Sequence, residues 1–516
     1  MSSEQNTRIC VPLHEAKFSA LQRAADQASV EADVIELRVD ALRDHELLND
    51  DLFSLIRNLA RPVILTFRPV EQGGYRDLSM AQRQDFWQHH FKSPAAFFDL
   101  ESDLVAELVG REVDQQPDWS RVICSYHDFK GVPQNLEDLY EQMAFTPARI
   151  LKFAFKANDI AECVQVFNLL GRAQSEDREI IALAMGEAGV ITRILGPSRG
   201  SFITYGTTDG NTGTAPGQLL TQELRSVYRI DSINADTMVT GLVGSPVAHS
   251  VSPHMHNAAF VAKNLDGVYL PFHVDDLPRF IKAMVNPSTR DLNWNLRGLS
   301  ITAPHKTEVI KYLDWVDPTA QRIGAVNTVV LESEQLRGYN TDAAGLIEPL
   351  VQRIGSLTGA RAAVIGAGGA ANAAVFALQQ QGADVTVYVR DLSRATILCE
   401  RFNVQCQSLQ SAAFAGTDLV INTTPLGSSG EKANETPAVA SQLRGSGFVY
   451  DLVYNPIETT FMREGKAAGC NVLGGLEMLA AQAQLQFKLW TNTNVSSELM
   501  YTAGSTALAK IFSEKL

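Results

Sequence analysis

Short apolar runs alternate with helical patterns through the first half of the chain. The stretches between the runs carry apolar residues at helical spacing, and the last of them spans Thr221–Arg229. Strands joined by helices in this way, within roughly 220 residues, predict a compact (β/α)8 barrel of the α/β class. The runs that predict the eight strands are Ile9–Val11, Val34–Leu37, Val63–Thr66, Phe97–Asp99, Val122–Ser125, Ile150–Phe153, Ile180–Met185 and Phe202–Thr204.

Charged residues gather where these strands end, which is where such barrels carry their chemistry. They are Glu36 and Arg38 at the second strand, Arg68 after the third, His127 after the fifth, Lys152 at the end of the sixth and Arg193 after the seventh. Lys152 lies in the apolar run ILKFAF. It is either a core residue with a buried stem or an amine whose pKa is lowered for nucleophilic work. His127 in SYHDF could then transfer protons for it.

The second half opens on a strand, a loop and a helix start. Thr240–Val243 predicts a buried strand, and Pro253 suits the first turn of a helix. Ser250 and Ser252 lie in the loop between them. Serine hydroxyls both donate and accept hydrogen bonds, so the loop suits a small polyol, although an ordinary junction is the alternative for two serines alone.

A dinucleotide-binding pattern follows farther along the chain. Ala362–Ile365 predicts a strand, and the glycine-rich GAGGAA then opens an alanine-rich helix. The glycines allow a tight turn and close backbone approach, while the helix N-terminus attracts a pyrophosphate. Arg390 and Arg394 follow the next strand and favour a 2′-phosphate, hence NADP. Asp391 between them is discordant, because NAD enzymes place an acid near this point.

Composition narrows the classes of function. A length of 516 residues predicts three or four domains, and a net charge of −14 argues against nucleic acid and acidic membranes as partners. The six cysteines have neither zinc-site nor C-x-x-C spacing and are expected to be reduced thiols. With no targeting segment or membrane span visible, we expect a cytoplasmic protein that holds no metal.

The motifs of the first half follow one another as ELRVD, TFRP, FFDLE, SYHDF, LKFA, MGEAGxxTR and APGQ. In this order they resemble the type I 3-dehydroquinate dehydratases. The resemblance implies that Lys152 forms an imine with the substrate ketone, that His127 transfers protons and that Arg193 binds the carboxylate. It also implies that the ring is held by Glu36, Arg38, Arg68, Thr214 and Gln218. Gln72 departs from the family, which usually has a glutamate there.

The second half resembles the shikimate dehydrogenases. The resemblance rests on GxPxxHSxSPxxHN from Gly244 to Asn257, then SITAPHK, GAVNT, YNTD, NTTPLG and DLVYNP. It implies that Lys306 and Asp342 form the catalytic pair, with His305 replacing the usual phenylalanine. The implied substrate ligands are Ser250, Ser252, Thr302, Asn327, Tyr454 and Gln482. The implied NADP contacts are Gly366, Ala367, Gly368, Gly369, Ala370, Arg390, Ser393, Arg394, Leu452 and Gly475.

Together the resemblances imply a bifunctional enzyme: a barrel followed by a two-lobed α/β dehydrogenase with a Rossmann NADP-binding lobe. It would dehydrate 3-dehydroquinate to 3-dehydroshikimate and reduce that to shikimate, in an oligomeric state left open. The expected segments are 1–230 for the barrel, 231–237 for a linker, 238–341 for the substrate lobe, 342–475 for the Rossmann lobe and 476–516 for helices returning to the substrate lobe. The alternatives are an NAD-linked quinate/shikimate dehydrogenase and a metabolite sensor without catalysis.

Overall fold

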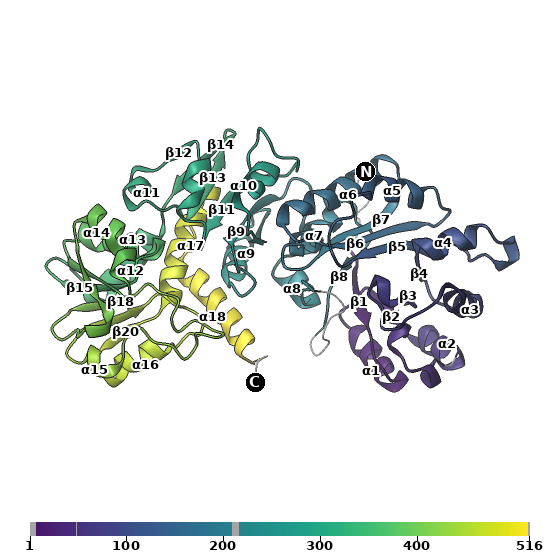
Figure 1. The fold of residues 1–516 in the computed structure, drawn as a ribbon, viewed down its shortest axis with the longest axis horizontal. Helices are drawn as coiled ribbons and strands as arrows, with labels where there is room; N and C mark the ends of the chain where they lie inside the picture. Colours follow the sequence, from purple (N-terminus) through teal and green to yellow (C-terminus); the bar gives the residue numbers. More distant parts are fainter. Residues whose placement is uncertain (1–6, 48, 209–215, 514–516) are drawn as a thin grey trace. The chain divides into compact units, whose positions relative to one another are not determined.

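Eight parallel strands form the first sheet of the computed structural model, which describes residues 7–47, 49–208 and 216–513. Their order is β7-β6-β5-β4-β3-β2-β1-β8, and one bridge pairs Ile180 of β7 with Ser201, just before β8. The sheet is therefore a nearly closed barrel, which confirms the predicted fold class (Figure 1). The strands are β1 Ile9–Leu13, β2 Val34–Arg38, β3 Val63–Thr66, β4 Phe97–Glu101, β5 Val122–Asp128, β6 Ile150–Lys156, β7 Glu179–Met185 and β8 Thr204–Tyr205.

Helices surround this sheet and cover it with their apolar faces. In α1, for example, Leu21, Ala25 and Ala28 are fully buried and recur at helical spacing. A capping box formed by Ser79 and Gln82 starts α3. The helices are α1 Phe18–Ala28, α2 Asn49–Asn58, α3 Met80–His90, α4 Ser102–Val109, α5 Leu136–Ala144, α6 Cys163–Ser175, α7 Val190–Leu195 and α8 Thr221–Ser226.

The barrel interior is layered because side chains alternate along each strand. One end is apolar and contains Val34, Ile64, Ile123 and Ile150. Two positions farther along these strands, and along β4, come buried polar side chains: Glu36, Thr66, Asp99, Ser125 and Lys152. The sequence pattern placed Lys152 at the end of the sixth strand, but it is the third residue of β6. His127 likewise lies within β5, because both strands run farther than their apolar runs.

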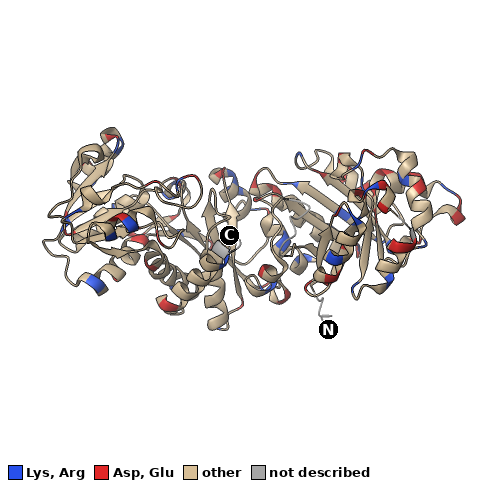
Figure 2. Cartoon of the chain, turned by 90° about the horizontal axis from the view of Figure 1, so that it is seen from below, with Lys and Arg blue, Asp and Glu red and all other residues tan. Residues whose placement is uncertain are grey.

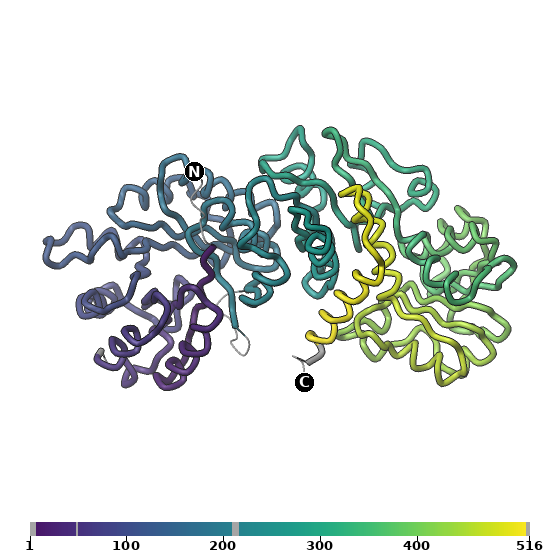
Figure 3. The backbone as a smooth tube through the Cα atoms, turned by 180° about the vertical axis from the view of Figure 1, so that it is seen from behind, coloured from purple at the N-terminus to yellow at the C-terminus, as the bar shows by residue number. Residues whose placement is uncertain are grey.

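The second sheet is mixed and has the order β10-β9-β11-β13-β14-β12. Its strands are β9 Met238–Gly244, β10 Gly267–His273, β11 Leu296–Ile301, β12 Trp315–Val316, β13 Thr328–Glu332 and β14 Gln335–Tyr339. Helix α9 (Ser252–Ala262) starts one residue before the predicted Pro253. The C-terminal helices α17 (Gly475–Thr491) and α18 (Ser497–Ser513) share an apolar core with α9, so the end of the chain lies beside this sheet (Figure 3).

The third sheet is wholly parallel, with the order β17-β16-β15-β18-β19-β20. Along β15, Ala362 and Val364 belong to one buried cluster, and Ala363 and Ile365 belong to another. Both faces are therefore covered, as in a doubly wound nucleotide-binding fold, and we call this part the Rossmann lobe. Its elements include α12 Asp342–Ile354, β15 Arg361–Ile365, α13 Gly369–Gln380, β16 Asp384–Val389, α14 Thr396–Phe402, β17 Gln405–Ser408, β18 Leu419–Asn422, α15 Ala440–Leu443, β19 Phe448–Asp451, α16 Thr460–Ala467 and β20 Asn471–Leu473.

The chain divides into two compact units. The first comprises Met1–Thr237, Pro271–Val285 and Thr289–Asn295, and the second comprises Met238–Leu270, Asn286–Ser288 and Leu296–Leu516. Among the residues that the structure describes, no helix is both long enough and apolar enough to cross a membrane.

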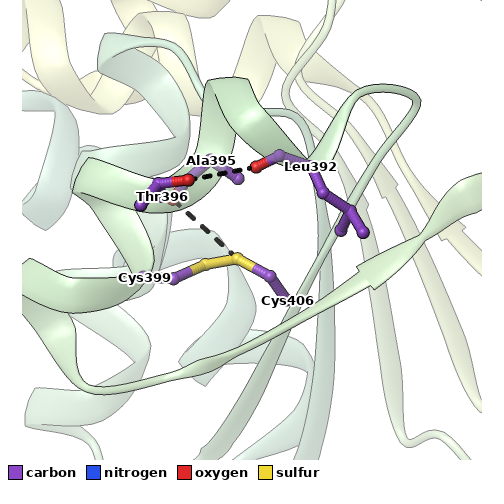
Figure 4. The surroundings of a disulfide bond; sticks show 5 residues. All are labelled: Leu392, Ala395, Thr396, Cys399 and Cys406. Carbon is purple, nitrogen blue, oxygen red and sulfur yellow. Dashed lines mark hydrogen bonds between the residues drawn. A yellow bond between two sulfur atoms is a disulfide. The ribbon is translucent and has the colours of Figure 1, made fainter.

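One prediction about the cysteines is wrong. Cys399 of α14 and Cys406 of β17 form a disulfide instead of remaining reduced (Figure 4). The sequence shows only two cysteines seven positions apart. Helix α14, however, ends at Asn403 in the left-handed conformation, and the chain turns back into β17. The turn brings the two Cα atoms to 6.3 Å, within the range that a disulfide needs.

Gly298 of β11 provides a test of packing in the second unit. A Cβ atom built on it would lie 2.0 Å from Nε1 of Trp490, and this indole donates a hydrogen bond to the Val329 carbonyl at 3.0 Å. We expect Gly298→Ala to lower the free energy of unfolding of the second unit by about 1–3 kcal/mol, measured by calorimetry. Gly171→Ala in α6 is the control, because its Cβ would meet nothing within 4 Å. An unchanged melting temperature for Gly298→Ala would contradict this packing.

Candidate active sites

Lys152 lies at the centre of the barrel site and is 3% exposed. Its Nζ is 2.7 Å from Oδ2 of Asp99 and 3.8 Å from Oε2 of Glu36. Ser125 donates a hydrogen bond to the other oxygen of Asp99 at 2.6 Å, and Thr66 donates to Glu36 at 2.8 Å. These bonds fix both carboxylates, so the amine is held by two oriented negative groups where little water reaches.

His127 is the second group of the barrel site, and its environment fixes its tautomer. Arg68 Nη1 lies 2.9 Å from His127 Nε2. Because a guanidinium can only donate, Nε2 must accept, and the proton of a neutral ring is then on Nδ1. Nδ1 is buried and has no hydrogen-bond partner among the described residues. Burial, followed by the charges of Arg68 and Lys152, lowers the pKa of His127 well below its usual value, so the ring is neutral at pH 7.

Arg68 links the charged groups of this site. Its Nη2 is 2.7 Å from Oδ1 of Asp99 and its Nε is 3.7 Å from Oε1 of Glu101. Burial alone would raise the pKa of Asp99, but Arg68 and Lys152 outweigh it and hold this pKa far below the usual range. Burial raises the pKa of Glu101 to about 7, although Arg68 and Arg83 oppose the shift. Asp99 therefore supplies a permanent negative charge beside the amine.

The other residues predicted for this site fall around the same small cavity, of about 40 Å³. Arg193 is 1% exposed, and burial lowers its pKa to about 10, which still leaves it charged at pH 7. Arg38 forms a two-point ion pair with Asp40, at 3.0 and 2.9 Å. The predicted residues that line the cavity are Glu36, Arg38, Arg68, His127, Lys152, Arg193 and Gln218. The predicted Thr214 lies outside the described residues.

Sequence reasoning missed three acidic members of this network: Asp40, Asp99 and Glu101. The motif FFDLE contained two of them, but only as a family marker. A signal was available, since Asp99 and Glu101 alternate with apolar residues in β4 as Glu36 and Arg38 do in β2. Asp40 continues the alternation of Glu36 and Arg38 in the motif ELRVD, but it lies beyond the end of β2 in a short 3-10 turn.

A larger cavity, of about 630 Å³, lies in the second unit. It brings together residues from the loop before α9, the end of β11, the start of α12 and the middle of α17. All the residues predicted to bind substrate or to catalyse in this unit line it: Ser250, Ser252, Thr302, Lys306, Asn327, Asp342, Tyr454 and Gln482. Among the described residues, no group of three or more histidine, cysteine, aspartate or glutamate side chains could hold a metal.

Lys306 and Asp342 form an ion pair in this cavity, with Nζ 2.5 Å from Oδ2. Asp342 is the first residue of α12, where a negative side chain is favoured by the helix dipole. Its other oxygen accepts a hydrogen bond at 2.8 Å from Asn327, which also lies 3.3 Å from Oε1 of Gln482. The lysine side chain is 21% exposed, so its charge reaches the cavity while its partner remains covered.

Two residues of the cavity lining, Ser300 and Gln486, belong to a buried hydrogen-bond network that sequence reasoning missed. Tyr269 donates to Ser300 at 2.8 Å, and Ser300 donates to Oε1 of Gln486 at 2.8 Å. Gln486 in turn donates to the Asn327 carbonyl at 3.1 Å. Burial raises the pKa of Tyr269, although hydrogen bonds with Ser300 and Ser252 oppose the shift. The network joins α17 to β11, and its members are too far apart in sequence to form a motif.

The glycine-rich turn borders the same cavity and fits a dinucleotide. Gly366 has a φ of +124°, which favours glycine, and α13 starts at Gly369. A Cβ on Gly368 would meet nothing within 4 Å, so the backbone N–H groups of the helix start are open to a ligand. Ala370, Leu452 and Gly475 line the cavity itself. Residues in this arrangement fit a pyrophosphate.

The segment after β16 holds the discordant Asp391. Its Oδ1 accepts hydrogen bonds from the backbone N–H of Ser393 at 3.0 Å and from its hydroxyl at 2.7 Å. Asp391 thereby caps the short 3-10 helix η11 (Leu392–Ala395), which carries Ser393 and Arg394. Arg394 Nε lies 3.8 Å from Oδ2 of Asp391. The carboxylate is engaged with its own segment, while Arg390 and Arg394 are exposed.

Comparison with known proteins assigns both units. Residues 9–235 match the type I 3-dehydroquinase model, 242–329 the shikimate dehydrogenase substrate binding domain, 349–432 the shikimate/quinate 5-dehydrogenase model and 475–503 the shikimate 5′-dehydrogenase C-terminal domain. A chloroplastic bifunctional 3-dehydroquinate dehydratase/shikimate dehydrogenase of Arabidopsis thaliana is 32% identical over 96% of this chain and 83% of its own. The chain belongs to this bifunctional family.

Single-function relatives match the second half. The shikimate dehydrogenase (NADP(+)) of Caldanaerobacter subterraneus is 39% identical over 52% of this chain and 97% of its own. A crystal structure of a shikimate dehydrogenase in complex with NADP+ covers 54% of this chain and 97% of its own, with 37% identity and a TM-score of 0.50. The bifunctional enzyme thus joins a lyase barrel to an NADP-dependent oxidoreductase.

This bifunctional dehydratase/dehydrogenase departs from the usual family pattern at three residues whose contacts the structure describes. Gln72 accepts a hydrogen bond from the backbone N–H of His127 at 3.1 Å, so the amide still contacts the histidine strand. Thr192 accepts from the Ala184 N–H at 2.9 Å and keeps the role of a hydroxyl. His305 is 2% exposed, and its Nδ1 lies 4.0 Å from Glu308. It is buried as a phenylalanine would be.

Proposed function

We propose that the chain converts 3-dehydroquinate to 3-dehydroshikimate in the barrel and reduces 3-dehydroshikimate to shikimate with NADPH in the second unit. The observation that carries the proposal is a lysine amine paired with a carboxylate in each site, buried at Lys152 and partly exposed at Lys306, beside a cavity lined by the residues that the family motifs predict. A metabolite sensor would have no need to bury such a reactive pair as Lys152 and His127.

In the barrel, the Lys152 ammonium first gives a proton to neutral His127 and the free amine then attacks the substrate ketone, after which His127 returns the proton to the hydroxyl of the carbinolamine. The carbinolamine loses water and becomes an iminium, which draws electrons from the adjacent carbon. His127 then takes a proton from that carbon through Nε2, whose lone pair first gives up the hydrogen bond from Arg68 Nη1. The resulting enamine expels the neighbouring hydroxyl, which leaves as water with the proton from His127. Hydrolysis of the iminium releases 3-dehydroshikimate and restores the free amine.

The charges around Lys152 suit this sequence of steps. Asp99 remains ionised and balances the positive iminium, as it balances the ammonium in the structure. The low pKa of His127 keeps the ring neutral and ready to accept a proton at pH 7. The chain has a net charge of −14, and its acidic and basic residues are interspersed (Figure 2). Arg193 and Arg68 supply positive charge at the barrel site itself. Local arginines therefore capture the substrate carboxylate and hydroxyls.

In the second unit, Lys306 delivers a proton to the substrate carbonyl oxygen, and Asp342 holds the ammonium in position. NADPH, when bound, would supply the hydride for the carbonyl carbon. Asn327 and Gln482 lie beside this pair, while Ser250, Ser252, Thr302 and Tyr454 offer hydroxyls to the substrate from other walls of the cavity.

The glycine-rich turn before α13 and the arginines Arg390 and Arg394 are the proposed contacts for NADP. Gly366, Ala367, Gly368, Gly369 and Ala370 would bind the pyrophosphate, and Leu452 and Gly475 would lie along the nicotinamide side. Arg390, Ser393 and Arg394 would bind the 2′-phosphate. The cap formed by Asp391 weighs against the NAD-linked alternative, because its carboxylate is already used by Ser393. A cytoplasmic location remains a prediction.

Lys152→Ala should lower the dehydratase turnover by at least roughly 10³-fold, because no other amine replaces the nucleophile. Borohydride added with 3-dehydroquinate should fix ligand mass on the peptide that carries Lys152. Lys156→Ala, an exposed position on the same strand, is the matched control. The reductase activity assayed from 3-dehydroshikimate should survive in both variants. Undiminished dehydration by Lys152→Ala would refute the imine.

Lys306→Ala should lower the turnover of 3-dehydroshikimate by about 10²–10⁴-fold with little change in its KM, because a proton donor acts mainly in the transition state. Steady-state kinetics of the reductase give both constants. The exposed Lys311→Ala serves as the control for loss of a nearby positive charge. A variant that turns over normally and only binds substrate more weakly would remove Lys306 from the chemistry.

Asp391→Ala should raise the KM for NADPH by about fivefold, because η11 loses its cap and Arg394 loses its position. Asp391→Asn keeps an acceptor for Ser393 and should stay close to the wild-type KM. The measurement is the KM for NADPH and NADH in all three proteins. If Asp391 instead binds an NAD ribose, both variants would weaken NADH binding and improve NADPH binding.

A further inference from the structure

The disulfide between Cys399 and Cys406 lies beside the segment proposed to bind the 2′-phosphate. Figure 4 shows the pair joining α14 to β17, with Leu392, Ala395 and Thr396 of the preceding turn next to it. Cys406 Sγ is 3.8 Å from the carbonyl oxygen of Ala395. Ala395 is the last residue of η11 and directly follows Arg394. The bond therefore ties down the end of the segment that carries the arginine.

Apart from the disulfide, this segment is held by few buried apolar side chains and by two hydrogen bonds of α14: Gln379 donates to the Phe402 carbonyl at 2.8 Å, and Arg401 donates to the Ile323 carbonyl at 2.7 Å. Ala395 and Leu398 are buried, but Leu392 is 49% exposed and Ile397 is 73% exposed. A seven-residue helix with one buried residue gains little from packing, and isolated helices of that length are not stable in water. A covalent link from α14 to the sheet thus replaces part of the missing apolar contact.

The two cysteines are also the ones that a reagent can reach. The other four, Cys10, Cys124, Cys163 and Cys470, are free and buried. Burial raises the thiol pKa of the first three of these, which makes them unreactive. Cys399 and Cys406 are partly exposed. Oxidation and reduction are therefore directed to this pair.

The redox state also changes a contact of η11. As a thiol, Cys406 can donate its S–H to the Ala395 carbonyl, whereas as a disulfide it has no hydrogen to donate. Reduction thus removes the covalent link from Cys406 to Cys399 and lets Cys406 donate a weak hydrogen bond to Ala395, which precedes Cys399 in the same segment. The turn that holds Arg394 is firmly attached in one state and loosely attached in the other.

We propose that Cys399 and Cys406 are a redox-active pair that tunes the affinity of the dehydrogenase for NADPH and leaves the dehydratase unaffected. In the oxidising direction, the thiolate of one cysteine attacks a low-molecular-weight disulfide and releases one thiol. The thiolate of the other cysteine then attacks this mixed disulfide and releases the second thiol. Two electrons pass to the reagent, and the two protein thiols lose their protons. The effect on NADPH rests on the proposed role of Arg394.

The full-length enzyme is equilibrated with either oxidised or reduced dithiothreitol, and its thiols are counted by alkylation and intact mass. We expect the KM for NADPH to rise by about three- to tenfold on reduction, a range typical of losing the preorganisation of one or two long side chains. The KM for NADH and the turnover number should change little. The dehydratase activity of the same chain is the internal control.

Three variants test whether the redox response comes from Cys399 and Cys406 and acts through Arg394. The double variant Cys399→Ser/Cys406→Ser should show no redox response, whereas Cys470→Ser should keep the full response. A disulfide that forms without altering the KM for NADPH, a pair that stays reduced in oxidised dithiothreitol, or a response that persists in the double variant would overturn the proposal. Arg394→Ala tests the cofactor assignment separately. If this variant keeps the wild-type KM for NADPH, the role of Arg394 is refuted. If its KM is raised but the wild-type enzyme shows no redox response, the redox pair alone is refuted.

Discussion

Each unit of this protein pairs a lysine amine with a carboxylate, and the placement of these pairs governs both sites. A buried charge without a partner is strongly destabilising, so Lys152 requires Asp99 and Glu36, and these require Ser125 and Thr66. Lys152 therefore determines the polar layer of the barrel. The apolar layer beneath it supplies the core that offsets the cost of burying so many charges.

The second unit solves the same problem with a more open geometry. Lys306 is partly exposed and needs one carboxylate, Asp342, which the start of α12 positions. Its remaining support comes from neutral groups: Asn327 donates to Asp342, and Gln486, which is hydrogen-bonded to Ser300 and through it to Tyr269, donates to the Asn327 carbonyl. A site that admits a cofactor and a polyol cannot be as closed as the barrel site, and the cavity volumes of about 630 and 40 Å³ reflect this difference.

The edge of the Rossmann lobe depends least on packing. Residues after β16 bury few apolar side chains, and short-range links take over: the cap by Asp391 and the disulfide between α14 and β17. Such links are set by single residues and can be changed without disturbing the sheet. Discrimination between cofactors and its regulation are therefore most easily placed here, at a distance from the lysine–carboxylate pairs.

The sequence by itself predicted the eight barrel strands, the glycine-rich turn and charged residues that line the two cavities, among them Lys152, His127 and Lys306, because apolar periodicity and short motifs are local signals. Strand ends were less well determined, and Lys152 and His127 proved to lie within β6 and β5 because hydrogen bonding continues past the apolar runs. Only the tertiary structure decided the partners. Asp99 reaches Lys152 across 53 positions and Ser300 reaches Gln486 across 186, and the turn at Asn403 brings Cys399 to Cys406. Contacts of this kind depend on the closure of a sheet or the reversal of a helix, which no local pattern of residues records.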